Sequence, residues 1–135
     1  MISRKKLLVI GNGMVGQLLL EKLAAAPHDF DVTVLCEEPR PAYDRVGLTS
    51  FFSGRSAADL SLVDEGFFER SGITVHLAER AESIDRETRR VTTSTGRLLQ
   101  YDQLVLATGS YPFVPPIPGR ERSNCFVYRT IEDLI

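Results

Sequence analysis

The most constraining feature of this sequence is a glycine-rich turn that directly follows an unbroken apolar run. Residues 7–10 read Leu-Leu-Val-Ile, and the next six residues are Gly-Asn-Gly-Met-Val-Gly. The apolar run predicts a buried parallel strand, and the apolar spacing over residues 14–26 predicts a helix. In such a turn Gly11 permits the tight bend, Gly13 lets the backbone approach a pyrophosphate, and Gly16 lets the helix pack against the sheet. The segment therefore predicts an α/β fold with a dinucleotide at the start of the helix.

A second strand with an acidic end follows the predicted helix. Residues 32–36 are Val-Thr-Val-Leu-Cys, and they lead into two carboxylates, Glu37 and Glu38. Glu37 lies about twenty residues beyond the last glycine, the spacing at which a carboxylate reaches the ribose hydroxyls of a dinucleotide. A glycine motif alone is weak evidence, but strand, turn, helix, strand and acid together predict dinucleotide binding. The motif is compatible with both FAD and NAD.

The composition is that of an ordinary globular domain and argues against several classes of protein. Of the 135 residues, 43% are hydrophobic and 25% are charged, and the formal net charge is −2. A nucleic-acid surface would need a clustered basic excess, whereas the arginines here are scattered. No apolar stretch approaches the length of a membrane span, and the amino-terminal MISRKK lacks the apolar region of a targeting segment. We therefore expect a cytoplasmic protein that binds neither nucleic acid nor membrane.

The two cysteines, Cys36 and Cys125, are far apart in the sequence and form no CxxC pair. Cys36 ends the second predicted strand, so we interpret it as a small buried residue rather than a redox thiol. Two isolated cysteines supply neither a zinc site nor an iron–sulfur cluster. The sequence therefore predicts no metal centre within this chain. His76, which alternates with apolar neighbours, is likewise interpreted as structural.

The segment after Glu38 is predicted to pass beside the bound dinucleotide as a loop. Residues 39–45 contain two prolines, which forbid a helix. Arg45 could pair with the pyrophosphate or the flavin region as a bidentate cation, or it could be a solvated loop side chain. In the next stretch the adjacent Phe51 and Phe52 are expected in the core.

A helix start, a short helix and a third strand are predicted further along the chain. Ser56 and Asp59 have the spacing of a loose capping box. Residues 61–71 are predicted to form a short helix that Gly72 closes. Residues 73–77, Ile-Thr-Val-His-Leu, have the composition of another strand of the parallel sheet.

The pattern changes after residue 80, where three short alternating segments replace the expected crossover helix. They cover residues 81–85, 90–94 and 97–101, and turn-like residues separate them. This pattern predicts an antiparallel three-stranded meander. An ordinary NAD-binding domain would have a helix here, whereas FAD-binding folds of the glutathione reductase type have a meander. The meander therefore favours FAD over NAD.

The last part of the chain contains one more buried strand and a proline-rich connection. Residues 104–107 predict a parallel strand whose end, at Thr108 and Gly109, faces the same crevice as Gly11. Residues 110–119 are rich in proline and have the composition of a linker. Residues 126–128 predict a short strand, and a helix is expected after an N-cap at Thr130, with Asp133 at its third position. We therefore divide the chain into an FAD-binding part, residues 1–110, and a connection, residues 111–135.

Four segments of the sequence resemble one family of flavoproteins. IGNGMVG, CEEPRPAYDR, LATGSYPFVPPIPG and VYRTIEDL together resemble the amino-terminal FAD segment of pyridine-nucleotide-dependent flavoprotein oxidoreductases. The resemblance is strongest to the large subunit of the NAD(P)H-dependent assimilatory nitrite reductases, and it runs from Leu7 to Leu134. It implies a Rossmann-like, three-layer FAD-binding fold in which this chain is an incomplete fragment of a longer polypeptide. It also implies that residues 111–135 begin the crossover towards an NAD(P)H domain that is absent from this chain.

The resemblance also implies which residues contact FAD, and it assigns no catalytic residue and no metal ligand to this chain. It places the ribose at Glu37 and the adenine at the backbone of Ala81, with cationic contacts from Arg45 and Arg129. One departure is Ser50, because ferredoxin-reductase-type relatives commonly carry a lysine at this point of the loop. The remaining predicted cofactor contacts are Gly11, Gly13, Met14, Val15, Gly16, Glu38, Ala107, Thr108 and Gly109.

The activity that the resemblance implies belongs to the longer polypeptide. There, NAD(P)H would reduce the FAD, and electrons would pass to iron–sulfur and sirohaem centres outside this chain, which alone should be inactive. The partners are then FAD and the remainder of the full-length chain. Two alternatives stay open: the FAD domain of a ferredoxin or rubredoxin reductase, and a non-catalytic nucleotide-sensing Rossmann module.

Overall fold

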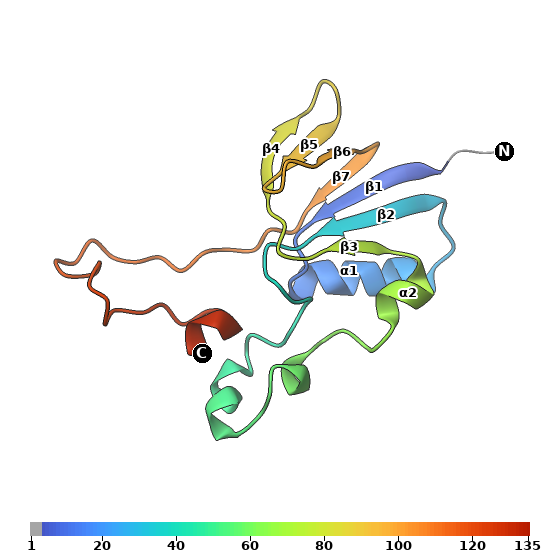
Figure 1. Ribbon diagram of the computed structural model, residues 1–135. Helices are drawn as coiled ribbons and strands as arrows, with labels where there is room; N and C mark the ends of the chain where they lie inside the picture. The colour runs from blue at the N-terminus through green and yellow to red at the C-terminus, as the bar shows by residue number, and fades with distance from the viewer. Residues whose placement is uncertain (1–3) are drawn as a thin grey trace.

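The computed structural model describes residues 4–135, and a four-stranded parallel sheet is its central layer. The strand order is β3-β2-β1-β7, so the first strand lies in the middle and the last strand forms one edge (Figure 1). The strands are β1 (Lys5–Ile10), β2 (Phe30–Leu35), β3 (Thr74–His76) and β7 (Gln103–Leu106). All four predicted parallel strands are therefore present, with bounds shifted by one or two residues.

The central strand is buried on both faces, which explains its unbroken apolar sequence. Side chains alternate along a strand, so Leu7 and Val9 pack in the cluster on the helix side, while Leu8 and Ile10 pack on the other side. Helix α1 (Met14–Ala25) and the short helix α2 (Phe67–Ser71) cover one face of the sheet. Each fully buried aliphatic side chain contributes about 1.5–3 kcal/mol of burial free energy.

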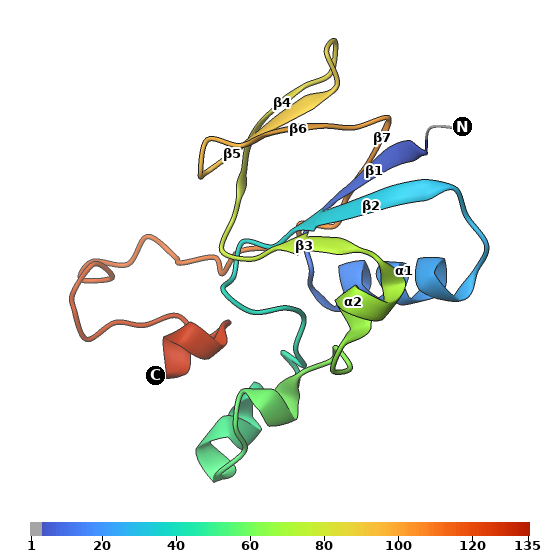
Figure 2. The same ribbon diagram turned by 45° about the vertical axis from the view of Figure 1, so that its right-hand side comes forward.

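The other face of the sheet carries the predicted meander. Its strands β4 (Ala81–Asp85), β5 (Arg90–Thr93) and β6 (Leu98–Gln100) pair antiparallel in the order β4-β5-β6. Val91 is fully buried and packs with Leu8, Ile10 and Leu35 of the parallel sheet. Meander, parallel sheet and helix thus form three layers (Figure 2), and the predicted α/β fold with an antiparallel meander is confirmed.

The loop segments form a smaller apolar cluster that ties the carboxyl-terminal turn to the middle of the chain. Tyr43, Leu48, Leu60 and Ile131 are all buried in it. Leu48, Leu60 and Ile131 lie in the 3₁₀ turns η1 (Leu48–Ser53), η2 (Ala58–Leu60) and η3 (Ile131–Leu134). Tyr43 forms a bridge with Ser61, the residue that follows η2. The predicted cap at Thr130 is confirmed, because its hydroxyl accepts from the Asp133 N–H and the Asp133 carboxylate accepts from the Thr130 N–H.

Three local predictions differ from the structure. The helix expected over residues 61–71 begins only at Phe67, because the Leu62 N–H donates to the Ala42 carbonyl and a turn at residues 65–66 comes before the helix. Phe52 is 67% exposed, since the 3₁₀ turn directs only Phe51 into the small apolar cluster. Residues 126–128 form no strand, because no neighbouring strand of the described chain pairs with them.

The capping box around Ser56 is present in its hydrogen bonds although the helix is only a single turn. The Asp59 N–H donates to the Ser56 hydroxyl at 3.2 Å, and the Ser56 N–H donates to the Asp59 carboxylate at 2.8 Å. Within residues 4–135, no helix combines the length and the apolar character that crossing a bilayer requires.

Candidate functional site

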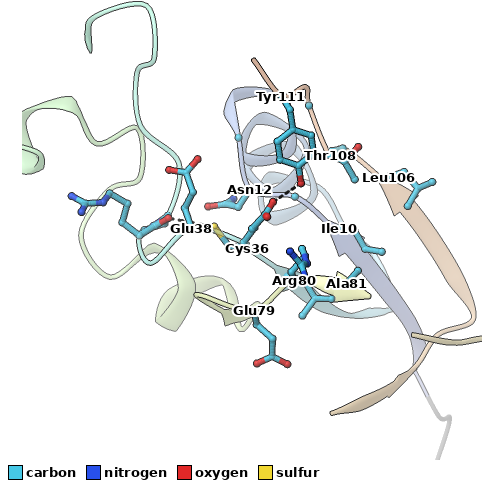
Figure 3. Close-up of a pocket in the computed structure, with 18 of the residues that line it drawn as sticks. Ile10, Asn12, Cys36, Glu38, Glu79, Arg80, Ala81, Leu106, Thr108 and Tyr111 are labelled. Atoms are coloured by element: carbon cyan, nitrogen blue, oxygen red, sulfur yellow. Dashed lines mark hydrogen bonds between the residues drawn. The ribbon is translucent and has the colours of Figure 1, made fainter. Parts of the chain in front are cut away.

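A cavity of about 450 Å³ opens at the carboxyl ends of the parallel strands. It is lined by the turn at Gly11 to Gly13, by the ends of β2 and β7, and by the start of β4. In Figure 3, Ile10, Leu106 and Thr108 lie on one side of the cavity. Asn12, Cys36 and Glu38 lie on the opposite side. This is the position where open parallel sheets bind their ligands, and it is the crevice predicted from the glycine motif.

Two of the motif glycines are required by the fold itself. Gly11 has a φ of +110°, and a Cβ atom there would lie 2.1 Å from the carbonyl oxygen of Ala107 on the neighbouring chain segment. A Cβ atom at Gly16 would lie 2.4 Å from the carbonyl oxygen of Gly11. Because both obstacles are backbone atoms, these positions allow β1, β7 and α1 to approach one another closely.

Gly13 has a different role, because a Cβ atom there would meet no atom within 4 Å. Its φ of −89° is open to any residue, so neither conformation nor packing demands glycine at this position. Gly13 lines the cavity and is the N-cap of α1, whose first N–H groups have no partner within the helix. The bare backbone therefore leaves room for a ligand at the positive end of the helix dipole, as a pyrophosphate would require.

The two strand-end carboxylates have separate environments. Glu37 is exposed and lines the cavity, and its Oε2 accepts a hydrogen bond of 2.8 Å from the hydroxyl of Tyr111. This bond raises the pKa of Tyr111. Glu38 is turned into a polar network, in which Oε2 accepts from the Tyr43 hydroxyl at 2.6 Å and Oε1 accepts from Arg45. Of the two carboxylates, Glu37 is therefore the one with acceptor capacity facing the cavity.

Arg45, which was predicted as a cationic contact of the cofactor, lies at the centre of this polar network. Its guanidinium pairs with Glu38 and donates to the Tyr43 hydroxyl at 2.9 Å and to the Arg129 carbonyl at 3.1 Å. Tyr43 is buried, and its hydroxyl also accepts from the Ile131 N–H at 3.2 Å. Burial together with the hydrogen bond to Glu38 raises the pKa of Tyr43 to about 12. Arg45 lines the cavity, but its hydrogen bonds join the loop to the carboxyl-terminal turn.

Most of the predicted cofactor contacts meet at the cavity. Nine line it: Gly11, Gly13, Glu37, Glu38, Arg45, Ala81, Ala107, Thr108 and Gly109. Four do not line it: Met14, Val15, Gly16 and Arg129. Met14 and Val15 lie in the first turn of α1, directly after the lining residue Gly13, and Val15 is 76% exposed. The Arg129 guanidinium lies near Gly109, 3.5 Å from where a Cβ atom of that glycine would stand.

Several lining residues were not anticipated from the sequence. Tyr111 comes from the proline-rich connection, and Arg80 precedes β4 and pairs with Glu82 at 2.6 Å. Asn12 is buried within the glycine motif, where its Oδ1 accepts from the Ala42 N–H at 2.8 Å and its Nδ2 donates to Gln17 at 2.9 Å. Asn12 thereby holds the loop that contains Ala42 against the glycine-rich turn. The sequence offers one indication of this role, which is that a polar residue, Asn12, stands between two glycines of the motif.

The Cys36 thiol lies in the cavity wall and is expected to be unreactive. It is 4% exposed and donates to the Arg40 carbonyl at 3.3 Å, and burial raises its pKa to about 11. Because the thiolate is the reactive form of cysteine, the raised pKa lowers the reactivity of this thiol at neutral pH. The interpretation of Cys36 as a buried structural residue is confirmed. Within the described residues, no group of three or more His, Cys, Asp or Glu side chains is placed to hold a metal ion.

This burial predicts selective alkylation of the native chain. Iodoacetamide at pH 8 should modify the exposed Cys125 and leave Cys36 unmodified until the chain is unfolded in guanidinium. Peptide mass mapping of native and unfolded samples measures both positions at once. Equal rates of modification at the two cysteines in the native chain would contradict the burial described here.

The fold and the cavity agree with a match to a known protein family. The chain belongs to the pyridine nucleotide-disulphide oxidoreductase family, whose model matches residues 5–134. The match covers the parallel sheet, the meander and the connection that follows them.

Among individual proteins, the chain is similar to nitrite reductase large subunits, as the sequence motifs predicted. It is 53% identical to the large subunit of the NADH nitrite reductase of Escherichia coli, over 98% of this chain and 16% of that protein. It is 49% identical to the NAD(P)H nitrite reductase large subunit of Klebsiella oxytoca, over 98% of this chain and 14% of that protein. The chain thus spans less than a fifth of the length of either relative.

Solved structures share the same fold at lower identity. A ferredoxin reductase from Rhodopseudomonas palustris superposes with a TM-score of 0.89 at 26% identity, over 96% of this chain and 32% of that protein. The NADH:rubredoxin oxidoreductase of Clostridium acetobutylicum gives a TM-score of 0.84 at 27% identity, over 96% of this chain and 34% of that protein. The chain therefore has the same fold as these two reductases.

Proposed function

We propose that this chain binds FAD and forms the flavin-binding part of an NAD(P)H-dependent nitrite reductase large subunit. The observation that carries the proposal is the open space beside Gly13, at the amino end of α1 and in the same cavity as Glu37. That space suits the adenosine diphosphate half of FAD, because a helix amino end favours phosphate and a carboxylate accepts from ribose hydroxyls. The 53% identity to a nitrite reductase large subunit supports the assignment of the reaction.

In this proposal each part of the cavity holds one part of the ligand. The free N–H groups at the start of α1 face the pyrophosphate, with Met14 and Val15 contributing backbone only. The Gly11 N–H donates to the Leu35 carbonyl, so Gly11 contributes the tight turn that leaves room for the ligand. Glu37 accepts from the ribose hydroxyls, and the backbone of Ala81 meets the adenine edge. The strand end formed by Ala107, Thr108 and Gly109 passes beside the diphosphate and the ribityl chain, with Arg129 near Gly109. Arg45 and Glu38 support this arrangement by fixing the loop that carries them.

The residues of this chain bind and orient, and the cofactor supplies the redox chemistry. Bound FAD would accept a hydride from NAD(P)H and release electrons singly to iron–sulfur and sirohaem centres outside this chain. We assign no general acid, base or nucleophile to the described residues. The isolated chain is therefore expected to bind FAD without reducing nitrite.

The role of Glu37 gives the test of this proposal. Glu37→Ala removes the charged acceptor of the ribose, and hydrogen bonds to charged groups contribute about 1.5–3 kcal/mol. We therefore expect FAD to bind roughly 10- to 100-fold more weakly, with an unchanged thermal midpoint because Glu37 is exposed. Quenching of flavin fluorescence on titration with the chain measures the affinity. Glu21→Ala, an exposed carboxylate of α1 outside the cavity, is the matched control, and equal affinities of both variants would contradict the proposal.

A ferredoxin or rubredoxin reductase is the second candidate, because solved structures of both kinds share this fold, with TM-scores of 0.89 and 0.84. The sequence identities of 26% and 27% to those proteins are half of that to the nitrite reductase large subunit. A nucleotide-sensing module is less well supported, since it would continue the alternation of helix and strand where β4, β5 and β6 lie. Binding of NADH in preference to FAD would favour the sensor.

A further inference from the structure

Tyr111 reaches over the cavity from the segment that leaves the sheet. It follows β7, whereas its hydrogen-bond partner Glu37 follows β2, and β1 lies between these two strands in the sheet. Figure 3 shows the Tyr111 ring pointing into the space between the two cavity walls. Tyr111 is 74% exposed, and within the described residues its hydroxyl makes one hydrogen bond, of 2.8 Å, to the Glu37 carboxylate.

The bond leaves one carboxylate oxygen available. Tyr111 donates to Oε2 of Glu37, and within the described part of the chain no group donates to Oε1. This differs from Glu38, where Tyr43 and Arg45 engage both oxygens. A carboxylate has about four lone-pair positions, so Oε2 can also accept a second hydrogen bond beside that of Tyr111.

An exposed glutamate without such an attachment would sample many rotamers. Ordering a flexible side chain on binding costs about 0.5–1.5 kcal/mol, and a partner that orders it beforehand removes that cost. Tyr111 has only two side-chain torsions, and the proline that follows it restricts its own backbone. It is therefore suited to hold a more flexible carboxylate in place.

We propose that Tyr111 is a positioning residue for the ribose subsite, holding the Glu37 carboxylate so that its free oxygen accepts from the ribose hydroxyl pair. This inference rests on the proposed function, because it requires the adenosine half of a dinucleotide in the cavity. Tyr111 acts on the ligand through Glu37. Its hydroxyl matters only when both the carboxylate and the ribose hydroxyls are present.

The test uses ADP, because the flavin half of FAD could contact the connection by itself. Tyr111→Phe keeps the ring and removes the hydroxyl, and ADP should then bind about fivefold more weakly in a calorimetric titration. With 2′,3′-dideoxy-ADP the parent and Tyr111→Phe should bind equally. In a Glu37→Ala background, Tyr111→Phe should have no further effect on ADP. Tyr128→Phe is the matched control, since its hydroxyl contacts Thr49 at 3.3 Å outside the cavity.

The outcomes separate this inference from the proposed function. Absence of ADP binding by the parent chain would overturn both. Normal ADP binding by the parent with tighter binding by Tyr111→Phe would overturn the positioning role alone, because the hydroxyl would then compete with the ribose. An equal loss of ADP and of 2′,3′-dideoxy-ADP would also overturn it, because the hydroxyl would act independently of the ribose. Thermal unfolding of each variant confirms that the fold is retained.

Discussion

Gly13→Val should abolish FAD binding by this chain and leave its fold intact. The valine side chain would stand in the open space of the cavity, where the pyrophosphate is proposed to lie. We expect at least about a 100-fold loss of affinity, because the obstruction lies at the amino end of α1, where phosphate would have to contact the backbone. Fluorescence titration with FAD measures the loss.

The fold should tolerate this change because of two opposing effects. Valine is a poorer N-cap than glycine by about 1 kcal/mol. Replacement of glycine also reduces the entropy of the unfolded chain, which stabilises the fold by about 0.4–1 kcal/mol. The net change is small, so the thermal midpoint should move by only a few degrees. FAD affinity equal to that of the parent would show that the ligand does not approach Gly13.

Gly16→Ala should instead destabilise the fold. The loss of stability should be large even in the absence of any ligand. A Cβ atom at Gly16 would lie 2.4 Å from the carbonyl oxygen of Gly11, so α1 and β1 must separate to admit it. Alanine gains about 1 kcal/mol of helix propensity over glycine, but a backbone clash of this size outweighs that gain. We expect a net loss of about 3 kcal/mol and a midpoint lower by roughly 10 °C.

The matched control for this variant is Gly13→Ala, the same substitution three residues earlier in the same motif. It meets no atom within 4 Å, so its midpoint should stay close to that of the parent. Thermal unfolding followed by circular dichroism compares the two variants directly. A Gly16→Ala chain that melts together with the Gly13→Ala chain would contradict the close packing described for the turn.

The layers of this fold could be predicted because they follow from local patterns. The apolar run before Gly11 matches a strand buried on both faces, and the alternating segments after residue 80 match the antiparallel meander. Predictions failed where the outcome depended on distant neighbours. Phe52 and residues 126–128 have apolar or strand-like sequences, but the chain brings neither a core nor a partner strand to them.

The site was predictable to the same extent. The motif spacing located the turn and Glu37, since those positions depend on a single strand-turn-helix-strand unit. It did not reveal that Glu38 and Arg45 engage each other, because that pairing depends on how the loop folds back toward the carboxyl-terminal turn. Tyr111 was missed for a similar reason. Its position beside Glu37 depends on the path of a proline-rich segment that has no regular pattern.

The central claim is that the cavity above Gly13 holds the adenosine diphosphate half of a flavin nucleotide. Backbone amide chemical shifts of the ¹⁵N-labelled chain during a titration with ADP test it most directly. The account predicts saturable shifts at Gly11, Gly13, Glu37 and Ala81, with Gly54 and Gly119 unchanged as glycines outside the cavity. Saturable shifts confined to residues outside the cavity, or none at the glycine turn, would contradict it.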